Sequence, residues 1–218
     1  MNNTVIAPVL ELIKGYVQAH RLPLVAEMAQ VRRDPFRILI STIISLRTKD
    51  EVTGPATERL FALAATPDDM LGLPEDVVME AIYPAGFYRN KTRTIRHVCR
   101  ELVTRYDGRV PDSIDELLTL NGVGRKTANL VVILGYGGRG ICVDIHVHRI
   151  SNRLGYVATK SPDETEWALR DKLPEEHWGT YNTYLVAFGR DICRPLSPLC
   201  SRCCVSQYCE RVGVTRSR

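Results

Sequence analysis

The chain has 218 residues, of which 44% are hydrophobic and 25% are charged, and its formal net charge is +4. That length is enough for one large domain or two small ones. The longest apolar runs, at 36–44 and 130–134, are interrupted by polar residues well short of the roughly 20 residues that a membrane-spanning helix needs. The composition therefore excludes an integral membrane protein and is typical of an ordinary globular chain.

Hydrophobic periodicity predicts helices along almost the whole chain, and strand patterns are absent. An Asp-Pro pair at 34–35 predicts the start of a helix that runs to about residue 46, and a Thr-Pro pair at 66–67 predicts a short one. Ser161 and Glu164 form a capping-box pattern ahead of another helix. Glycine and proline residues divide the pattern into about ten helices joined by short loops. The predicted fold class is all-α.

A basic segment lies between Arg89 and Arg109, with seven Lys or Arg residues against two acidic ones. One face of its predicted helix is apolar, and another face carries three arginines. The apolar positions are Ile95, Val98, Cys99, Leu102, Val103 and Tyr106, and the arginines are Arg93, Arg96 and Arg100. This charge indicates either a polyanionic partner or an ordinary solvated helix face.

The string Leu120-Asn-Gly-Val-Gly-Arg-Lys-Thr-Ala128 joins two predicted helices, at 113–120 and from 125 to about 135. Gly122 and Gly124 allow positive φ and close approach of the backbone to a ligand. Amide groups of Gly122, Val123, Gly124 and Arg125 would then point outward at the start of the second helix, which favours a phosphate. The string resembles the helix-hairpin-helix element that binds the DNA backbone, although a bare Gly-x-Gly would fit a plain helix turn equally well.

Two candidate catalytic residues follow that hairpin. Lys126 lies in the first turn of the second helix, where it feels positive potential and, if also desolvated, would become a nucleophilic amine. Asp144 lies 18 residues further along, where its carboxylate could stabilise a developing cationic sugar. Each residue also has an ordinary interpretation, since lysines are usually solvated and Asp144 could simply cap the next helix.

Four cysteines near the C-terminus have the spacing C-x6-C-x2-C-x5-C, at Cys193, Cys200, Cys203 and Cys209. Thiolates this close together in sequence predict one metal centre rather than a secreted disulfide framework, because no apolar signal segment precedes Pro8. Four thiolates suit either structural zinc or an iron-sulfur cluster, and the spacing alone does not choose between them.

Together, these motifs resemble one family, the endonuclease III type of DNA glycosylase in the helix-hairpin-helix superfamily. The resemblance covers nearly the whole chain. It includes Ser45-Leu-Arg-Thr-Lys-Asp50, Gly86-Phe-Tyr-Arg-Asn-Lys91, the hairpin with Lys126, Val143-Asp144-x-His146, Arg149 and the four cysteines.

The resemblance implies two all-α domains flanking a DNA-binding cleft. A six-helix barrel would span 27–139, with the helix-hairpin-helix at about 113–136, and residues 1–26 would pack with 140–218 in a cluster domain whose loop is 193–209. In this family the cysteines hold a 4Fe-4S cluster, which selects iron over zinc by resemblance.

The resemblance also implies a mechanism and a partner. The partner is double-stranded DNA with a damaged base or an abasic site, and a monomeric, cytoplasmic enzyme without a membrane partner is expected, nucleoid-associated if prokaryotic. The target nucleotide is rotated out of the duplex. Lys126 and Asp144, from opposite sides of the cleft, then release an oxidised or damaged pyrimidine, and the Schiff base on Lys126 leads to strand cleavage by β-elimination. Arg149 is expected among the DNA contacts.

Several positions depart from the commonest pattern of the family. Asn121 replaces a proline in the hairpin, Arg47 replaces a glutamine that fills the gap left by the flipped nucleotide, and Phe87 replaces a leucine wedge. Arg47 could bond to an orphan guanine and Phe87 could stack between bases, although Phe87 could also be a core residue. Cys204 matches no ligand of the family and is interpreted as a spare thiol that competes for iron.

Two alternative functions stay open on these residues. One is a thymine/guanine mismatch glycosylase, which Arg47 favours. The other is a DNA-binding or redox-sensing iron-sulfur protein that keeps mainly abasic-site lyase activity. The presence of both Lys126 and Asp144 argues against the second alternative.

Overall fold

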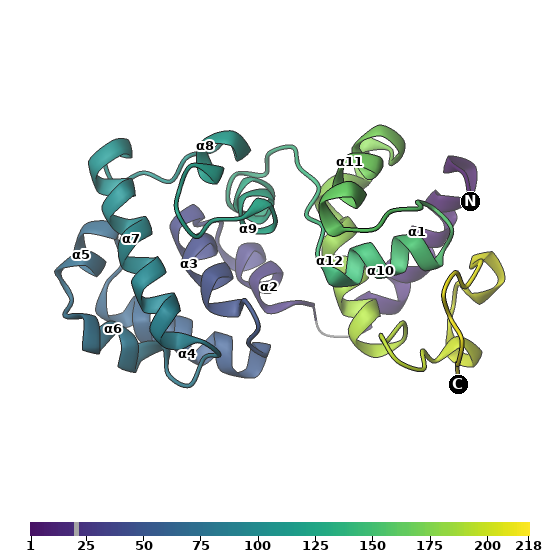
Figure 1. Cartoon of the computed structure of the whole chain (residues 1–218), viewed down its shortest axis with the longest axis horizontal. Coiled ribbons are helices and arrows are strands. Elements are labelled where there is room, and N and C mark those ends of the chain that lie inside the picture. Colours follow the sequence, from purple (N-terminus) through teal and green to yellow (C-terminus); the bar gives the residue numbers. More distant parts are fainter. Residues whose placement is uncertain (20–21) are drawn as a thin grey trace. The chain divides into compact units, whose positions relative to one another are not determined.

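The computed structural model describes residues 1–19 and 22–218, and within them it contains twelve α-helices and no β-strand (Figure 1). The all-α prediction is therefore confirmed, and the estimate of about ten helices was slightly low. None of the helices in the described ranges is long and apolar enough to cross a bilayer.

Capping side chains begin the helices that the sequence predicted. Helix α3 (Pro35–Ser45) begins after Asp34, whose carboxylate accepts the Arg37 N–H at 3.0 Å. Helix α5 (Pro67–Gly72) begins after Thr66, which accepts the Asp69 N–H at 3.1 Å. In both cases proline at the first helical position supplies a fitting φ, and the cap satisfies one of the backbone donors left open at the helix start.

The predicted capping box before α11 (Pro162–Lys172) is only half formed. The Ser161 hydroxyl accepts the Glu164 N–H at 3.2 Å, as the pattern requires. The Glu164 carboxylate, however, accepts the Lys160 N–H at 2.9 Å, one residue before the expected donor. The prediction was wrong on this second bond, because the backbone turns so that a neighbouring N–H comes within reach instead.

The chain divides into two compact units, Met1–Pro23 with Arg139–Arg218 and Leu24–Gly138. We call them the terminal unit and the central unit. Their boundaries lie within three residues of the predicted ones at 26/27 and 139/140, while their interpretation as a cluster domain and a six-helix barrel stays a prediction.

The central unit is built around α3. Its core is formed by apolar side chains of α3, α7 and the helices between them, among them Ile40, Ile44, Leu60, Ile95 and Leu102. Besides α3 and α5, its helices are α2 (Leu24–Val31), α4 (Asp50–Leu63), α6 (Glu75–Ile82), α7 (Tyr88–Tyr106), α8 (Ile114–Leu118) and α9 (Arg125–Leu130) (Figure 1).

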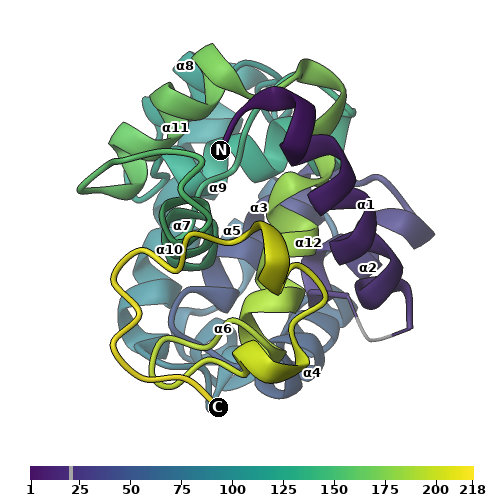
Figure 2. The same cartoon turned by 90° about the vertical axis from the view of Figure 1, so that its right-hand side faces the viewer.

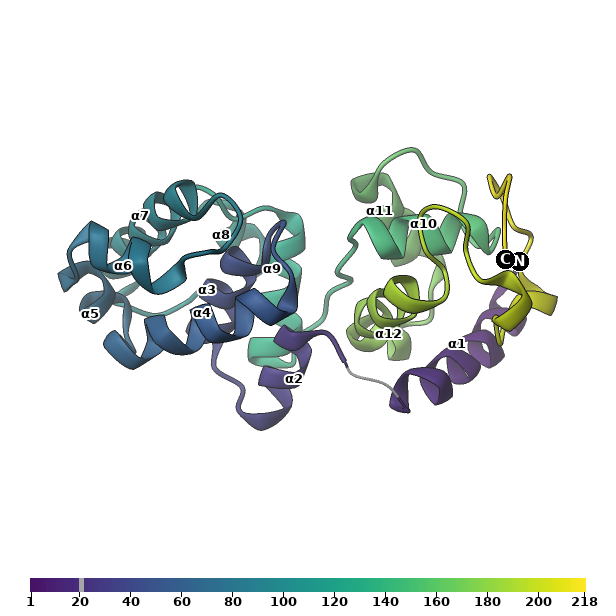
Figure 3. The same ribbon diagram turned by 90° about the horizontal axis from the view of Figure 1, so that it is seen from below.

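The terminal unit joins the two ends of the chain. Helix α1 (Asn3–Gln18) packs on α12 (Trp178–Asp191), as Figures 2 and 3 show, and α12 also packs on α10 (Ile145–Arg153). The N-terminal amine of Met1 forms an ion pair with Glu210 at 2.8 Å. Beyond α12 the chain is irregular, apart from short 3-10 turns at Cys200–Arg202 and Ser206–Tyr208.

The hairpin 120–124 connects α8 and α9 within the central unit. Gly122 has φ +91° and lies against α7, where an added Cβ would be 2.4 Å from Thr94 Cγ2. Gly124 does not use the positive φ that glycine allows, because its φ is −93°, and an added Cβ would meet nothing within 4 Å. Gly124 is the N-cap residue of α9, so its extended conformation is set by the start of the helix.

The helix after the hairpin is also shorter than predicted. Helix α9 ends at Leu130, and the chain continues as a π-helical segment, Val131–Tyr136. The helical conformation as a whole thus ends close to the expected residue 135, but its second half is π-helical. Apolar periodicity cannot distinguish a π-helical turn from an α-helical one.

The two hairpin glycines provide a matched pair for mutation. We expect Gly122→Ala to destabilise the protein by about 1–3 kcal/mol, because φ is positive and the β-branched Thr94 has little freedom to move away. Gly124→Ala should cost less than about 1 kcal/mol, the effect of a poorer N-cap. Urea denaturation of both variants measures the difference, and equal losses would contradict this account of the hairpin.

Candidate functional site

Lys126 and Asp144 belong to different units. Lys126 is the second residue of α9, two residues after Gly124, and its side chain is half-buried in the central unit. Asp144 is the N-cap residue of α10 in the terminal unit and is also half-buried. Each candidate therefore stands at the start of a helix, directly after an irregular segment.

The cap interpretation of Asp144 is confirmed, and the cap leaves part of the carboxylate available. Oδ1 accepts the backbone N–H groups of His146 at 2.8 Å and Val147 at 3.0 Å. Oδ2 makes no hydrogen bond to any residue of the described ranges. The cap thus orients the side chain with one oxygen and leaves the other able to interact with a ligand.

Arg47 and Phe87 lie together on the central unit. The Arg47 guanidinium carbon lies 5.2 Å from the centroid of the Phe87 ring, which is a cation–π distance. Both residues have positive φ, 55° and 58°, a conformation that non-glycine residues seldom adopt. The Phe87 residue is 60% exposed, so the alternative of core packing was wrong.

A buried lysine holds the loops that carry these two residues. Lys91 Nζ donates to the carbonyl of Ile44 and to Thr48 Oγ1, both at 2.7 Å, and Thr48 Oγ1 also accepts the Gly86 N–H at 3.0 Å. Gly86 is packed so closely that an added Cβ would be 2.7 Å from the Arg47 carbonyl oxygen. The loops before α4 and before α7 are therefore fixed to one another by a single ammonium group.

Arg149 and Arg153 of α10 bind the chain where the cysteine loop begins. Arg149 donates to the carbonyl oxygens of Cys193, at 2.9 and 3.1 Å, and Gly189, at 3.2 Å. Arg153 donates to the Arg194 carbonyl at 2.6 Å and to Cys193 Sγ at 3.5 Å. Most donors of Arg149 are thus engaged within the protein, and its contact with DNA stays a prediction.

The four predicted ligand thiols are half-buried in the loop after α12. Burial, with smaller effects from the charges of Cys204, Cys193 and Cys209, raises the pKa of Cys203 to about 11. Burial also raises the pKa of Cys209, with added effects from Cys193 and Cys200. Such effects require the sulfurs to be neighbours. Nevertheless, among the described residues no three His, Cys, Asp or Glu side chains are arranged to hold a metal ion.

Cys204 is directed differently from these thiols. Its Sγ lies 3.7 Å from the carbonyl oxygen of Leu12 in α1, at the distance of a weak hydrogen bond. Competition of Cys204 for iron stays a prediction.

The sequence reasoning missed Lys91, Thr48 and Arg153. Lys91 was named only within a family motif and the basic segment, although its spacing of four residues from Ile95 places it on the apolar face of the helix. That spacing is the one signal that could have indicated burial. The partners of Arg153 lie about 40 residues away in sequence and had no local signal.

The buried Lys91 predicts a pH dependence of stability. Burial lowers its pKa to about 8 from the ordinary 10.5, so between these values the unfolded chain binds a proton that the folded chain does not. Stability should therefore rise with pH across this window, and the cost of burying the ammonium is fully present below it. In urea denaturation, the free energy of unfolding of the wild type relative to Lys91→Met should increase by about 1–2 kcal/mol from about pH 7.5 to 9.5. A difference that does not change with pH would contradict the burial of the charge.

Known proteins resemble the chain in sequence and in structure. Residues 40–175 match the family described as HhH-GPD superfamily base excision DNA repair protein. Endonuclease III of Thermotoga maritima is 46% identical over 200 residues, covering 92% of this chain and 89% of the relative. A trapped endonuclease III–DNA covalent intermediate is 36% identical with a TM-score of 0.84, covering 97% of each chain.

A thermostable thymine-DNA glycosylase is less similar, at 24% identity with a TM-score of 0.74, covering 93% of this chain and 97% of the other. That likeness extends to the fold alone. The sequence identity to endonuclease III over nearly its full length is decisive, and the chain belongs to the endonuclease III family of the HhH-GPD superfamily, the DNA glycosylases and abasic-site lyases of base-excision repair.

Proposed function

We propose that this enzyme removes oxidised or otherwise damaged pyrimidines from double-stranded DNA and cleaves the resulting abasic site through a Schiff base on Lys126. The observation that carries this proposal is the position of Lys126, two residues after the hairpin, at the start of α9. The endonuclease III structure trapped as a covalent DNA intermediate supports an enzyme-linked reaction in this family.

The proposed reaction proceeds in two steps. The neutral amine of Lys126 forms a bond to C1′ of the sugar while the glycosidic bond breaks, and its electron pair leaves with the base. The attached nitrogen loses a proton and its lone pair then breaks the bond between C1′ and O4′, so that the ring opens, O4′ takes up a proton and an iminium forms. This iminium withdraws electrons and acidifies the proton at C2′. Loss of that proton forms a double bond and breaks the bond between C3′ and its oxygen, so the 3′ phosphate leaves. Hydrolysis of the imine then releases the enzyme.

Asp144 is proposed to stabilise the positive charge that develops on the sugar or to activate the lysine. Its free Oδ2 supports this role, because the bonds to the backbone of α10 hold the carboxylate in place through Oδ1. A carboxylate held in place before the reaction stabilises a developing cation without needing to reorganise.

The hairpin and the Arg47–Phe87 pair are the proposed DNA contacts. Gly124 leaves open space beside the backbone, which supports close approach of a phosphate to the hairpin 120–124. The exposed Phe87 ring is suited to stacking between bases, and the guanidinium of Arg47 beside it is suited to the acceptor edge of a guanine. The enzyme is proposed to act as a monomer.

The four cysteines are proposed to hold a 4Fe-4S cluster. Zinc needs four sulfurs at about 2.3 Å from one ion, whereas each thiolate of an iron-sulfur cluster binds its own iron and stands further from the others. The charges of these thiols affect one another, which supports one shared group, and the resemblance of their spacing to the family's iron-sulfur pattern favours the cluster. Arg153 and the Arg211 N–H, at 3.5 Å from Cys193 Sγ and 3.4 Å from Cys209 Sγ, would offset its negative charge.

Borohydride trapping tests the role of Lys126. With a duplex carrying thymine glycol, the wild type should form a covalent protein–DNA adduct on reduction, and Lys126→Gln should form none. A variant that still cleaves abasic DNA by β-elimination at the wild-type rate would sink the assignment. If the enzyme released thymine from a T/G mismatch faster than it released thymine glycol, the substrate would be the mismatch, as in the alternative function of a thymine/guanine mismatch glycosylase.

Asp144→Asn is the matched control for this experiment. Asparagine caps a helix about as well as aspartate, so the fold and DNA binding should be kept while the charge is lost. Base release should slow by about 10²-fold or more, because transition-state stabilisation depends on that charge. Full activity of the folded variant would leave Asp144 as a helix cap only.

Metal content tests the cluster independently of activity. The purified protein should be brown, with broad absorption near about 400 nm from thiolate-to-iron charge transfer, and should contain about four irons per chain. Cys200→Ser should lower both the iron content and the soluble yield, since metal binding is coupled to folding of the loop. A colourless protein loaded with zinc would overturn this proposal.

A further inference from the structure

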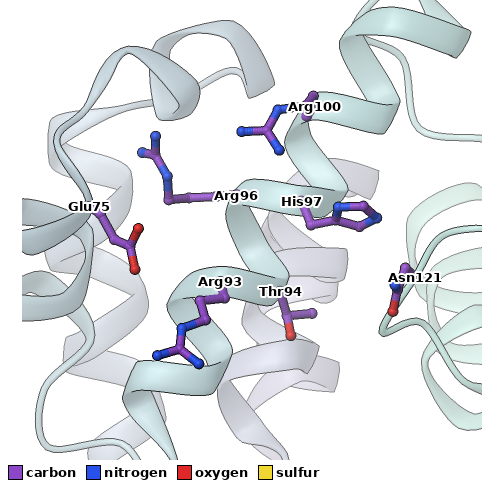
Figure 4. Close-up of a pocket in the computed structure, with 7 residues that line it drawn as sticks. All are labelled: Glu75, Arg93, Thr94, Arg96, His97, Arg100 and Asn121. Atoms are coloured by element: carbon purple, nitrogen blue, oxygen red, sulfur yellow. The ribbon is translucent and has the colours of Figure 1, made fainter.

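An open groove lies on the outer side of α7 in the central unit (Figure 4). Its volume is about 390 Å³. Five of its seven residues come from α7, one from the start of α6 and one from the hairpin. The lining residues are Glu75, Arg93, Thr94, Arg96, His97, Arg100 and Asn121.

The groove is strongly positive, and two of its guanidinium groups are uncommitted. Arg96 donates to the Leu73 carbonyl at 2.5 Å, which holds that side chain on the protein. The guanidinium groups of Arg93 and Arg100 make no hydrogen bond or ion pair with any described residue, and both residues are exposed. Three arginines thus face a single carboxylate, Glu75, on the opposite wall (Figure 4). Such an excess favours an anionic ligand.

The groove continues from the hairpin. Gly122 packs directly on Thr94, and the Asn121 N–H donates to Glu101 Oε2 at 3.2 Å, so two hairpin residues are anchored on α7. The Asn121 side chain forms the wall of the groove on that side (Figure 4). A DNA strand held at the hairpin presents further phosphates at intervals of about 3.4 Å along the duplex axis. The groove begins at Asn121 and therefore adjoins the hairpin at which the strand is proposed to bind.

We propose that this groove binds phosphates of the DNA strand next to those held by the hairpin, through Arg93 and Arg100. The inference rests on the proposed role of the hairpin in binding DNA. Guanidinium groups match phosphate oxygens with paired hydrogen bonds, and the contact carries no base sequence. The groove therefore strengthens binding to any duplex and does not select the lesion.

The salt dependence of binding tests this proposal. Arg93→Gln/Arg100→Gln should reduce the slope of log K against log [salt] by about 2, one unit for each lost phosphate contact. At about 0.1 M salt the affinity for undamaged and lesion-bearing duplexes should fall by roughly tenfold or more, equally for both. Arg96 is left unchanged because its bond to Leu73 supports the fold.

Arg32→Gln/Arg109→Gln is the matched control, since it removes the same charge from two exposed arginines of the same unit. A slope that falls equally in both double variants would overturn the proposal, because only net charge would then matter. The proposal would also be overturned if Arg93→Gln/Arg100→Gln lost binding of inorganic polyphosphate but kept the wild-type salt slope for DNA, since the groove would then hold a different anion.

Glu75→Gln tests the opposite sign. If phosphates enter the groove, removal of this carboxylate should tighten DNA binding severalfold, and unchanged or weaker binding would count against the proposal.

Borohydride trapping separates this inference from the proposed function. If the wild type traps DNA but the groove variants bind normally, only the groove assignment fails, whereas a wild type that does not trap overturns the function itself.

Discussion

Burial of one face of α7 is the constraint on which the central unit depends. Each residue turns an α-helix by about 100°, so once Ile95, Val98 and Leu102 are buried, the direction of every other side chain on the helix is set. Lys91 then falls on the buried face and Thr94 at its edge, against the hairpin. Arg93, Arg96 and Arg100 fall within an arc of about 60° on the far side. One packing interaction thus positions the loops, the hairpin and the basic groove together.

The central unit contains several locally destabilising features close to the exposed residues Arg47 and Phe87. Arg47 and Phe87 adopt positive φ, and the Lys91 ammonium group is buried without a carboxylate partner among the described residues. Each of these features destabilises a chain unless the surroundings compensate for it. Here the compensation is the pair of bonds from Lys91, which fixes both loops before any ligand arrives. Side chains held in advance lose less entropy on binding, so this arrangement would favour the proposed DNA contacts of Phe87 and Arg47.

In the terminal unit, α10 supports both the Asp144 carboxylate and the start of the cysteine loop. Backbone N–H groups at the start of α10 bind the Asp144 carboxylate as a helix cap. Further along the same helix, Arg149 and Arg153 donate hydrogen bonds to Cys193. A disturbance of α10 would therefore alter both the carboxylate and the thiol loop. This shared support explains how an irregular loop is held in one arrangement, since its carbonyl groups are bound by the half-buried guanidinium donors of Arg149 and Arg153.

The sequence by itself determined the fold class, the starts of helices at Asp34 and Thr66 and the cap at Asp144, and its motifs were sufficient to identify the family. These signals act within a few residues, because capping, proline geometry and hydrophobic periodicity are local. Only the tertiary structure decided that Lys91 is buried, that Arg149 is engaged by Cys193 and that Phe87 is exposed. Burial and bonding partners depend on segments 40 or more residues away, which no local pattern specifies.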